Sequence, residues 1–488
     1  MEICPTTPYT YIHMNDHPTD HPMWIGGQAV RTASRKDVLV PFDNSVAGTI
    51  YQASLEQVDA AIEAARKAFP AMRALSRHER SSILYKAHAL LGERREEMAR
   101  AISSESGKPI REARTEVERG MFTLLFSAEE AHRLHGDEVP LDAHPGGRGK
   151  TGMTIREPLG VIAAITPFNF PLNLSLHKIG PAIAGGNTVV HKPASATPIS
   201  ALLLAGIFRD AGLPAGALNV ITGPGGTIGD ALTFDPRVAM VTFTGSPDVG
   251  QRIRNLAGMK RVTLELGSNS AVIIEPDADL DKAVPKCVAG AFSHSGQVCI
   301  SVQRIYAHET IRDEFATRMA EAAARLKIGH PREETTDVSS LITEAEARRI
   351  ESWIGEARDG GAKLIAGGAR HGATVDPAIL TDVPASANLN VKEAFGPVVS
   401  VNSYKTLDDA IAMVNASDYG LQAGMYTRDL EKAFRAAREV HVGGFHINEV
   451  PAFRVDQMPY GGVRLSGTGR EGPRYAIEEM TELKLITW

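Results

Sequence analysis

Three side chains stand in segments whose composition is typical of covalent catalysis. Cys299 follows Ser, Gly and Gln in SHSGQVCIS, which predicts an accessible turn, and an accessible thiol with a lowered pKa is a nucleophile. Glu265 lies among Val and Leu in VTLELGSNS, where burial would raise its pKa and make it a general base near neutrality. Asn169 follows an apolar strand in AITPFNFPLN and could donate its amide to a developing oxyanion.

Each of the three also has a structural interpretation that these patterns leave open. A lone cysteine such as Cys299 is often a small core residue, and an asparagine such as Asn169 suits a turn after a strand. Strand alternation would turn Glu265 toward solvent, because a carboxylate buried without a partner is costly. Burial and neighbouring groups therefore decide between the two interpretations.

Two further segments have features of a cofactor site. Lys192 falls at the carboxyl end of a strand in VVHKPASATP, where ligands of open α/β sheets bind, although lysines are usually solvated. In VTFTGSPDVG, Gly245 and Ser246 open a helix after a strand, as at phosphate-binding helix N-termini. The spacing there is Gly-x-x-x-x-Gly, which differs from the usual dinucleotide fingerprint.

These residues need a framework of parallel sheets. Apolar strands alternate with helices from residue 160 onward, and such alternation is typical of parallel sheets with both faces covered. The first series has strands at 161–165, 187–190, 218–222 and 240–243, with a helix at 198–212. A second series from about residue 270 has strands at 304–308, 395–401, 422–427 and 443–447, and helices at 279–291, 309–326, 407–415 and 428–439.

The remaining segments predict a helical N-terminal part and a projecting hairpin. Ser54 and Gln57 form a capping-box pattern before a helix at 55–69, and helix-like stretches run from 79 to 134. Pro and Gly interrupt 138–157, which predicts a hairpin that leaves the main body. The C-terminal TELKLITW predicts an exposed strand that pairs with this hairpin or with another subunit.

Composition excludes several classes of protein. The 488 residues are 43% hydrophobic and 23% charged, enough for a large core in about three domains or lobes. There is no apolar run of about 18 residues and no basic stripe, so neither a membrane span nor nucleic-acid binding is expected. Three cysteines and no secretory signal indicate the cytoplasm. Cys4, His13, His17 and His21 could hold a metal, but a frayed tail is the expectation and no metal site is predicted.

Seven motifs occur together in one order: TPFNFP, HKPAS, FTGS, LELGSNS, GQVCIS, KEAFGP and MPYGGVRLSGTGREG. In this the chain resembles the aldehyde dehydrogenase superfamily, of the hydrolytic NAD(P)-dependent type, from about Ile25 to Leu485. The resemblance implies an α/β fold with a Rossmann-like cofactor domain (1–137 and 158–265) and an α/β catalytic domain (266–466). A small β oligomerisation flap (138–157 and 467–488) would assemble homodimers or homotetramers.

Residue roles follow from the same resemblance. Cys299 matches the nucleophile, Glu265 the general base, and Asn169 the oxyanion donor that works with the Cys299 backbone N–H. The positions that match cofactor contacts are Thr166, Pro167, Asn169, Lys192, Ser195, Gly225, Phe243, Gly245, Ser246, Leu266, Glu393 and Phe395. Ser195 stands where NAD-preferring members often carry Glu, so both NAD and NADP are expected to bind.

The substrate pocket implied by the resemblance contains two arginines. The matching positions are Arg119, Phe122, Phe170, Ser301, Phe453 and Arg454. Two convergent arginines would grip a carboxylate, sulfonate, phosphate or phosphonate, unless each is a surface or ion-paired residue. We therefore expect oxidation of a short, acid-bearing aldehyde to the carboxylic acid through a thiohemiacetal and a thioester of Cys299.

Two other functions remain open. A CoA-acylating aldehyde dehydrogenase would share the cysteine but typically lacks the general base, so Glu265 disfavours it. A non-catalytic scaffold protein could use the same fold, because fold alone does not determine function. The presence of Cys299, Glu265 and Asn169 together disfavours this second alternative.

Overall fold

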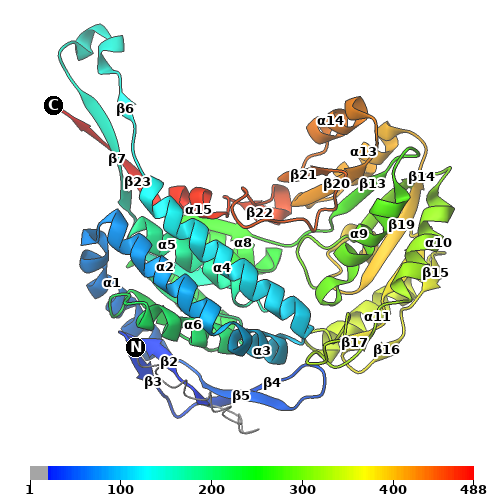
Figure 1. The fold of residues 1–488 in the computed structure, drawn as a ribbon, viewed down its shortest axis with the longest axis horizontal. Coiled ribbons are helices and arrows are strands. Elements are labelled where there is room, and N and C mark those ends of the chain that lie inside the picture. The colour runs from blue at the N-terminus through cyan, green and yellow to red at the C-terminus, as the bar shows by residue number, and fades with distance from the viewer. Residues whose placement is uncertain (1–19) are drawn as a thin grey trace, which may run out of the picture.

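The computed structural model describes residues 20–488, so Cys4, His13 and His17 of the possible metal cluster lie outside the described residues. Two lobes, each built on a central sheet, stand side by side, and a narrow flap projects from one of them (Figure 1). Within residues 20–488, no helix is both long and apolar enough to cross a membrane. No cluster of three metal-ligating side chains occurs in this part of the chain.

Four helices follow the N-terminal strands, and side-chain caps set where the first two begin. Capping boxes of Ser54 with Gln57 and of Ser76 with Glu79 start the first two helices. The predicted helix at 55–69 extends to Ala74, and the stretch 79–134 divides into three helices. The four helices are α1 (Leu55–Ala74), α2 (Arg77–Glu93), α3 (Arg95–Ser106) and α4 (Ile110–Arg133).

The first lobe contains an eight-stranded sheet with the order β22-β12-β11-β8-β9-β10-β2-β3. Its five central strands are parallel; β22 and β2 pair antiparallel with the two ends of this set, and β3 pairs antiparallel with β2. The strands are β2 (Met23–Ile25), β3 (Gln28–Val30), β8 (Val161–Ile165), β9 (Thr188–Lys192), β10 (Leu218–Val220), β11 (Val238–Thr244), β12 (Arg261–Glu265) and β22 (Gly467–Thr468). A small separate sheet joins β1 (Asp20–His21), β4 (Arg35–Leu39) and β5 (Val46–Tyr51).

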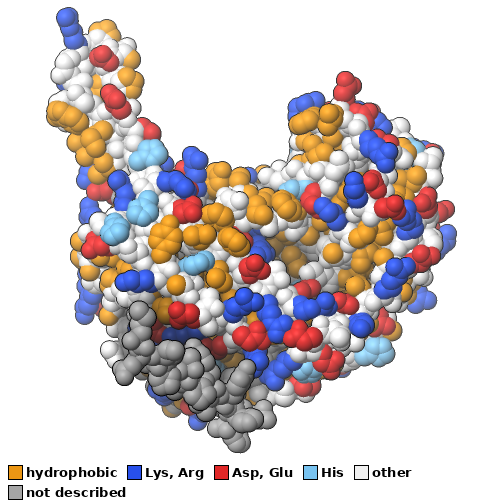
Figure 2. All heavy atoms as spheres, in the orientation of Figure 1, with side chains coloured by type: hydrophobic (Ala, Val, Ile, Leu, Met, Phe, Trp, Pro, Cys, Tyr) orange, Lys and Arg blue, Asp and Glu red, His pale blue; other side chains and the backbone are white. Residues whose placement is uncertain are grey.

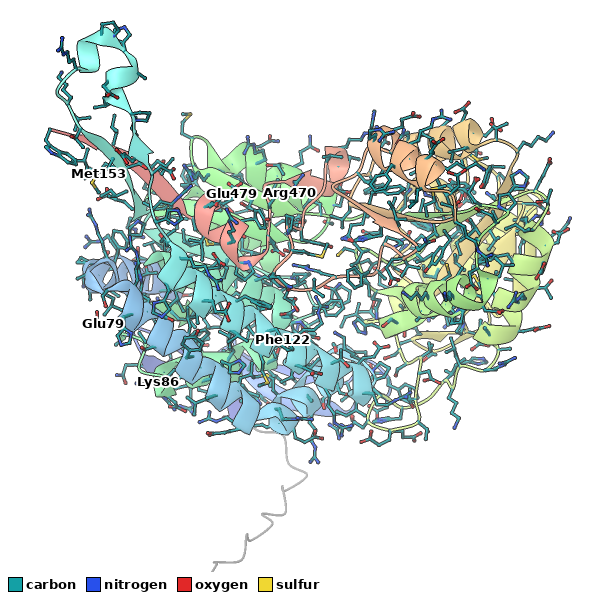
Figure 3. The ribbon with its side chains drawn as sticks, turned by 45° about the horizontal axis from the view of Figure 1, so that its top comes forward. Glu79, Lys86, Phe122, Met153, Arg470 and Glu479 are labelled. Atoms are coloured by element: carbon teal, nitrogen blue, oxygen red, sulfur yellow. The ribbon has the colours of Figure 1, made fainter. Side chains whose placement is uncertain are left out.

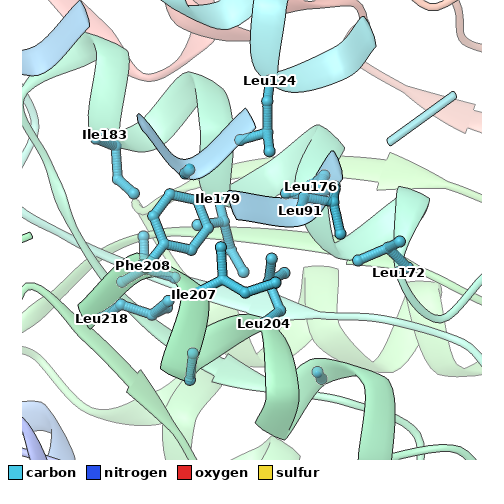
Figure 4. Close-up of a cluster of buried hydrophobic side chains, with 14 of the residues drawn as sticks. Leu91, Leu124, Leu172, Leu176, Ile179, Ile183, Leu204, Ile207, Phe208 and Leu218 are labelled. Carbon is cyan, nitrogen blue, oxygen red and sulfur yellow. The ribbon is translucent and has the colours of Figure 1, made fainter. Parts of the chain in front are cut away.

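Helices cover this sheet and form the largest core. The later helices of the lobe are α5 (Asn173–Gly185), α6 (Ile199–Asp210), α7 (Asp230–Phe234), α8 (Pro247–Ala257) and α15 (Pro473–Glu479). Figure 4 shows Leu124 of α4, Ile179 of α5 and Phe208 of α6 meeting in one cluster. Every residue of α5 is buried, so this helix provides a rigid support beneath the segment that carries Asn169.

The second lobe contains a seven-stranded sheet with the order β15-β18-β19-β14-β13-β20-β21, parallel except at β15. Its strands are β13 (Ala271–Ile274), β14 (Arg304–His308), β15 (Lys363–Ala366), β18 (Ala378–Thr381), β19 (Val398–Tyr404), β20 (Gln422–Tyr426) and β21 (Gly444–Ile447). Its helices are α9 (Leu280–Phe292), α10 (Arg312–Ala323), α11 (Glu344–Asp359), α12 (Asn388–Val391), α13 (Leu407–Asn415) and α14 (Leu430–Glu439). The pair β16 (Arg370–His371) and β17 (Thr374–Val375) forms a separate hairpin.

The flap is a three-stranded antiparallel sheet of β6 (Glu138–Val139), β7 (Gly152–Pro158) and β23 (Thr481–Thr487). The second flap segment is shorter than the expected 467–488. Residues 467–468 form β22 and pair with β12, while α15 packs against α5, so only β23 belongs to the flap. Leu483 and Leu485 of β23 are more than half exposed, and hydrophobic side chains gather on the flap surface (Figure 2).

Candidate active site

Cys299 lies in the wall of a cavity of about 330 Å³. Residues of α4, the segment after β8, the end of α9 and the loop after β21 line it. Sγ of Cys299 is 2.9 Å from the hydroxyl of Tyr460. Burial raises the pKa of the Cys299 thiol to about 11, and the hydrogen bond from Tyr460 and the charge of Arg454 oppose this rise. The thiol therefore lies in the cavity wall with a pKa above its ordinary value.

A left-handed turn presents Cys299 to the cavity. After α9, His294, Ser295 and Gly296 have φ of 46°, 56° and 73°, three successive residues in the left-handed region. A Cβ at Gly296 would lie 2.1 Å from the carbonyl oxygen of Gly396, so this position requires glycine. The structure thus agrees with the turn predicted from SHSGQVCIS rather than with a core cysteine.

Asn169 joins the segment after β8 to this turn. Its Nδ2 donates a hydrogen bond of 2.8 Å to the carbonyl oxygen of Gln297, two residues before Cys299. Asn169 is 2% exposed, and no group among residues 20–488 hydrogen-bonds its buried Oδ1. Because an amide nitrogen carries two protons, one N–H of Asn169 remains beyond the bond to Gln297, although Asn169 is not among the residues that line the cavity.

Two glutamates of α4 hold the segments that carry Asn169 and Cys299. Oε1 of Glu116 accepts hydrogen bonds from the backbone N–H groups of Leu172 (3.0 Å) and Asn173 (3.1 Å), and its other oxygen pairs with buried Lys108. Glu112, one helical turn away, accepts from the Ser293 hydroxyl (3.0 Å) and from the backbone N–H of His294 (2.8 Å). The sequence reasoning missed both glutamates, although their i, i+4 spacing on a helix was visible.

Glu265 ends β12 and is 2% exposed. The solvent-facing alternative is wrong, because helices and loops cover both faces of this parallel strand and Val262–Glu265 are all buried. In the described part of the chain, neither carboxylate oxygen has a hydrogen-bond partner. Burial and the nearby charge of Glu471 raise the pKa of Glu265 well above its ordinary value. A carboxyl in this state suits a general base.

A buried ion pair lies beside Glu265. Nζ of Lys178 in α5 is 2.8 Å from Oε1 of Glu471, and both side chains are at most 2% exposed. Burial would raise the pKa of Glu471, but the charge of Lys178, with that of Arg454, outweighs it and lowers this pKa to about 2. The sequence patterns had no signal for this pair, since its members are 293 residues apart.

Residues expected to bind a cofactor gather at the carboxyl ends of β8, β9 and β11. Lys192 ends β9 and is 4% exposed, and burial lowers its pKa to about 8. Its Nζ contacts only the neighbouring Pro193 carbonyl at 3.3 Å among the described groups. The Ser195 hydroxyl donates to the Gly223 carbonyl oxygen at 2.7 Å, so its own proton is already engaged.

The contacts of the other expected cofactor positions differ from one residue to the next. Gly225 has open space where a Cβ would be, and Ser246 caps α8 without a side-chain hydrogen bond, which leaves first-turn N–H groups for a phosphate. Glu393 accepts a 2.9 Å bond from the Ser268 N–H, and burial raises its pKa to about 7. The remaining expected positions are Thr166, Pro167 and Phe243 near the strand ends, Gly245 against the Phe243 ring, Leu266 beneath Gly250, and Phe395 against Phe168.

The structure places only half of the expected substrate residues on the cavity. Arg119, Phe170 and Arg454 line it, whereas Phe122, Ser301 and Phe453 do not. Phe122 lies one turn beyond Arg119 on α4, is 46% exposed and lines a separate surface cavity (Figure 3). Ser301 donates to the Gly290 and Ala291 carbonyls (both 3.2 Å) at the end of α9.

Phe453 also lies outside the wall of this cavity. It is 43% exposed, and its ring contacts the edge of His446. Both arginines, in turn, are ion-paired. Arg119 pairs with Asp456 at 2.9 Å and Arg454 with Glu471 at 3.2 Å.

The fold and the site together define an α/β protein with a cysteine-centred cavity beside a dinucleotide-type set of strand ends. Residues 28–486 match the aldehyde dehydrogenase family, and the chain belongs to that family. It is 48% identical to 3-sulfolactaldehyde dehydrogenase from Priestia aryabhattai over 95% of this chain and 97% of that protein. It is 40% identical to lactaldehyde dehydrogenase from Methanococcus aeolicus over 95% and 99%, respectively.

Solved structures agree. Aldehyde dehydrogenase 21 from Physcomitrella patens, in complex with succinate, superposes with a TM-score of 0.95 at 40% identity, covering 97% of this chain and 98% of that one. GapN from Methanocaldococcus jannaschii, complexed with NADP, gives 0.90 at 38% identity, covering 94% and 100%. The family, the fold class and the enzymatic nature predicted from the sequence are confirmed. The protein is an aldehyde dehydrogenase, a family that supports a nicotinamide cofactor and small aldehyde substrates.

Proposed function

We propose that the protein oxidises a short aldehyde bearing an acidic group to the carboxylic acid, with NAD or NADP. One observation carries this proposal: Arg119 and Arg454 line the cavity that contains Cys299, and the ion pair of Arg454 leaves its buried Nε without an acceptor among residues 20–488. Guanidinium groups bind carboxylates and sulfonates through paired hydrogen bonds. Relatives of this chain are named for acid-bearing aldehydes, among them 3-sulfolactaldehyde and, in Escherichia coli, succinate semialdehyde.

Cys299 is the proposed nucleophile. Its sulfur, as thiolate, attacks the aldehyde carbon, and the carbonyl oxygen becomes an oxyanion. The available N–H of Asn169 and the backbone N–H of Cys299 hold this oxyanion, and a donor of this kind contributes about 3 kcal/mol to transition-state stability. Tyr460 supports the thiolate through its 2.9 Å hydrogen bond to Sγ.

Glu265 is the proposed base for the second half of the reaction. A bound nicotinamide dinucleotide supplies the hydride acceptor for the oxidation. The product is then held on Cys299 as a thioester, and Glu265 takes a proton from the water that cleaves it. The raised pKa of Glu265 suits a group that must accept a proton near neutral pH.

Lys192, Glu393 and the N-terminus of α8 are proposed to hold the cofactor. Lys192 and Glu393 would contact its two riboses, and the N–H groups after Ser246 its phosphates. No acidic side chain stands at position 195, so nothing there repels the 2′-phosphate of NADP. Measuring kcat/KM with both cofactors tests this inference, which a preference for NAD above about a hundredfold would contradict.

We also propose that the flap mediates homodimers or homotetramers. Its outer strand β23 exposes Leu483 (54%), Leu485 (55%) and the adjacent Trp488 (65%), and such a strand edge invites pairing with another chain. Sedimentation of the protein with and without residues 481–488 measures this contribution.

The decisive experiment is a turnover screen with Arg454→Ala. We expect the wild type to prefer acid-bearing aldehydes over uncharged ones of equal length, and Arg454→Ala to raise KM for the acidic substrates alone. Arg474→Ala, which removes an arginine 67% exposed on α15, is the matched control. An unchanged KM would overturn the anion-binding role. Parallel assays with and without CoA separate hydrolysis from acyl transfer to CoA.

A further inference from the structure

Asp456 joins two polar residues of the cavity wall, Arg119 and Asn173, to the buried His177. It is 4% exposed, and its Oδ1 accepts hydrogen bonds from Arg119 Nη2 (2.9 Å), Asn173 Nδ2 (3.0 Å) and His177 Nε2 (2.9 Å). Its Oδ2 accepts a longer bond from Arg119 Nε (3.3 Å). Arg119 therefore faces Asp456 through two nitrogens, and this carboxylate neutralises its charge.

The proton of His177 determines what remains for Arg454. Nε2 of His177 lies 2.9 Å from Asp456 and 3.2 Å from Nη2 of Arg454, and one nitrogen cannot donate to the first while it accepts from the second. The bond to a carboxylate is charge-assisted and stronger, so the proton lies on Nε2 and points to Asp456. Burial and the charge of Arg454 lower the pKa of His177, which keeps the ring neutral.

The positive charge of Arg454 is consequently only partly balanced by carboxylates. It pairs with Glu471 at 3.2 Å, but that carboxylate also accepts a shorter bond of 2.8 Å from Lys178. In residues 20–488 no acceptor reaches its buried Nε. Arg454 lies over the ring of Tyr460, 3.6 Å from the ring centre, which fixes the guanidinium beside Cys299.

The ion pairs of this cluster contain one more cation than carboxylates. Arg119, Arg454 and Lys178 face two ionised carboxylates, Asp456 and Glu471. Lys108 and Glu116 neutralise each other. Glu112 and Glu265 make no ion pair with these three cations, and burial raises the pKa of both.

We propose that Asp456 selects the charge of the substrate's acid group: by neutralising Arg119 it limits the cavity to a singly charged acid. Carboxylates and sulfonates carry one negative charge, whereas a phosphate group carries nearly two above neutral pH. A second negative charge would face Asp456 and Glu471 without a compensating cation. This inference rests on the proposed anion-binding function and names the class of acid that the same site accepts.

The test compares substrates that differ in charge in a single variant. At pH 8 the ratio of kcat/KM for 3-sulfolactaldehyde to that for glyceraldehyde 3-phosphate is measured in the wild type and in Asp456→Asn, with propanal as the uncharged reference. Asparagine keeps the shape and an acceptor oxygen but removes the charge. We expect a wild-type ratio above about tenfold that falls by about tenfold in the variant, as expected for one charge a few ångströms away. A ratio cancels differences in the folded fraction.

Asp337→Asn is the matched control. Asp337 pairs with Arg111, which lies on α4 like Arg119 but does not line the Cys299 cavity. This variant should keep the wild-type ratio. A wild type that prefers neither acid over propanal refutes the proposed function itself. A wild type that prefers both acids equally, or a variant ratio within twofold of wild type, refutes the role of Asp456 alone. If Asp456→Asn does not fold, Arg119→Gln must lower kcat/KM for both acids relative to propanal, and an unchanged value refutes the inference.

Discussion

The two buried glutamates on either side of Cys299 differ in their hydrogen bonding. On the side of α4, the buried carboxylate of Glu116 accepts three hydrogen bonds, and one of its donors is a buried lysine. On the side of β12, the equally buried Glu265 has no hydrogen-bond partner among the described residues. The carboxylate of Glu116 thus has its hydrogen bonds satisfied, whereas that of Glu265 does not; we call these the satisfied and the unsatisfied carboxylate.

This difference separates positioning from reactivity. A buried carboxylate that accepts several hydrogen bonds holds backbone segments in place, as Glu116 does for the N-terminus of α5. A buried carboxylate without partners carries a desolvation cost that raises its affinity for a proton. Unsatisfied polar groups in a cavity wall therefore indicate where a ligand or water completes the site.

The largest effect is expected for Cys299→Ala, which removes the atom between the two sides. We expect no measurable aldehyde oxidation, because no other group in the cavity wall supplies a thiolate. Binding of NADPH, followed by fluorescence, should be retained. Normal turnover in this variant would refute the assignment of the nucleophile, and loss of NADPH binding would point to misfolding instead.

Glu265→Gln tests the carboxylate that has no hydrogen-bond partner. We expect slow thioester hydrolysis, by about 10²–10⁴-fold, while the first turnover stays fast, because the amide cannot take a proton from water. Stopped-flow absorbance of the reduced cofactor should show a burst and then a slow steady state. A variant without a burst, whose single-turnover rate falls as much as its steady state, would contradict the assignment of this base.

Glu116→Gln tests the carboxylate whose hydrogen bonds are satisfied. It leaves the buried Lys108 without its carboxylate, which should lower the free energy of unfolding by about 3–5 kcal/mol. Thermal and urea unfolding measure the change, and Glu118→Gln, at an exposed position of the same helix, is the control. If both variants unfold at the same midpoint, the Glu116 carboxylate does not contribute to the free energy of unfolding as predicted.

Tyr460→Phe should have the smallest effect. Its hydroxyl lowers the pKa of Cys299, so its removal should raise that pKa further above about 11. Below that pH less thiolate is present, and the burst rate at pH 8 should fall about fivefold, the equivalent of one hydrogen bond. The pH–rate profile of the burst should shift upward, and an unshifted profile would show that Tyr460 does not act on the thiol.

Much of the framework could be predicted from local patterns. The run at 161–165, the capping box at Ser54 and the helix at 407–415 were recognisable, because apolar periodicity and capping are properties of a few neighbouring residues. The helix α11 was missed, and α15 was assigned to the flap. Substrate contacts were less predictable. Phe122 and Phe453 suit a pocket by type, but their side chains point away from the cavity.

The sequence by itself determined the family, through seven motifs in one order, and the residue types available for chemistry. Only the tertiary structure decided which of those groups have hydrogen-bond and ion-pair partners and which have none. Glu471 and Lys178, 293 residues apart, meet beside Glu265, and Asp456 meets Arg119 across 337 residues. Burial, charge and proton affinity depend on such distant neighbours, and no pattern within one segment contains them.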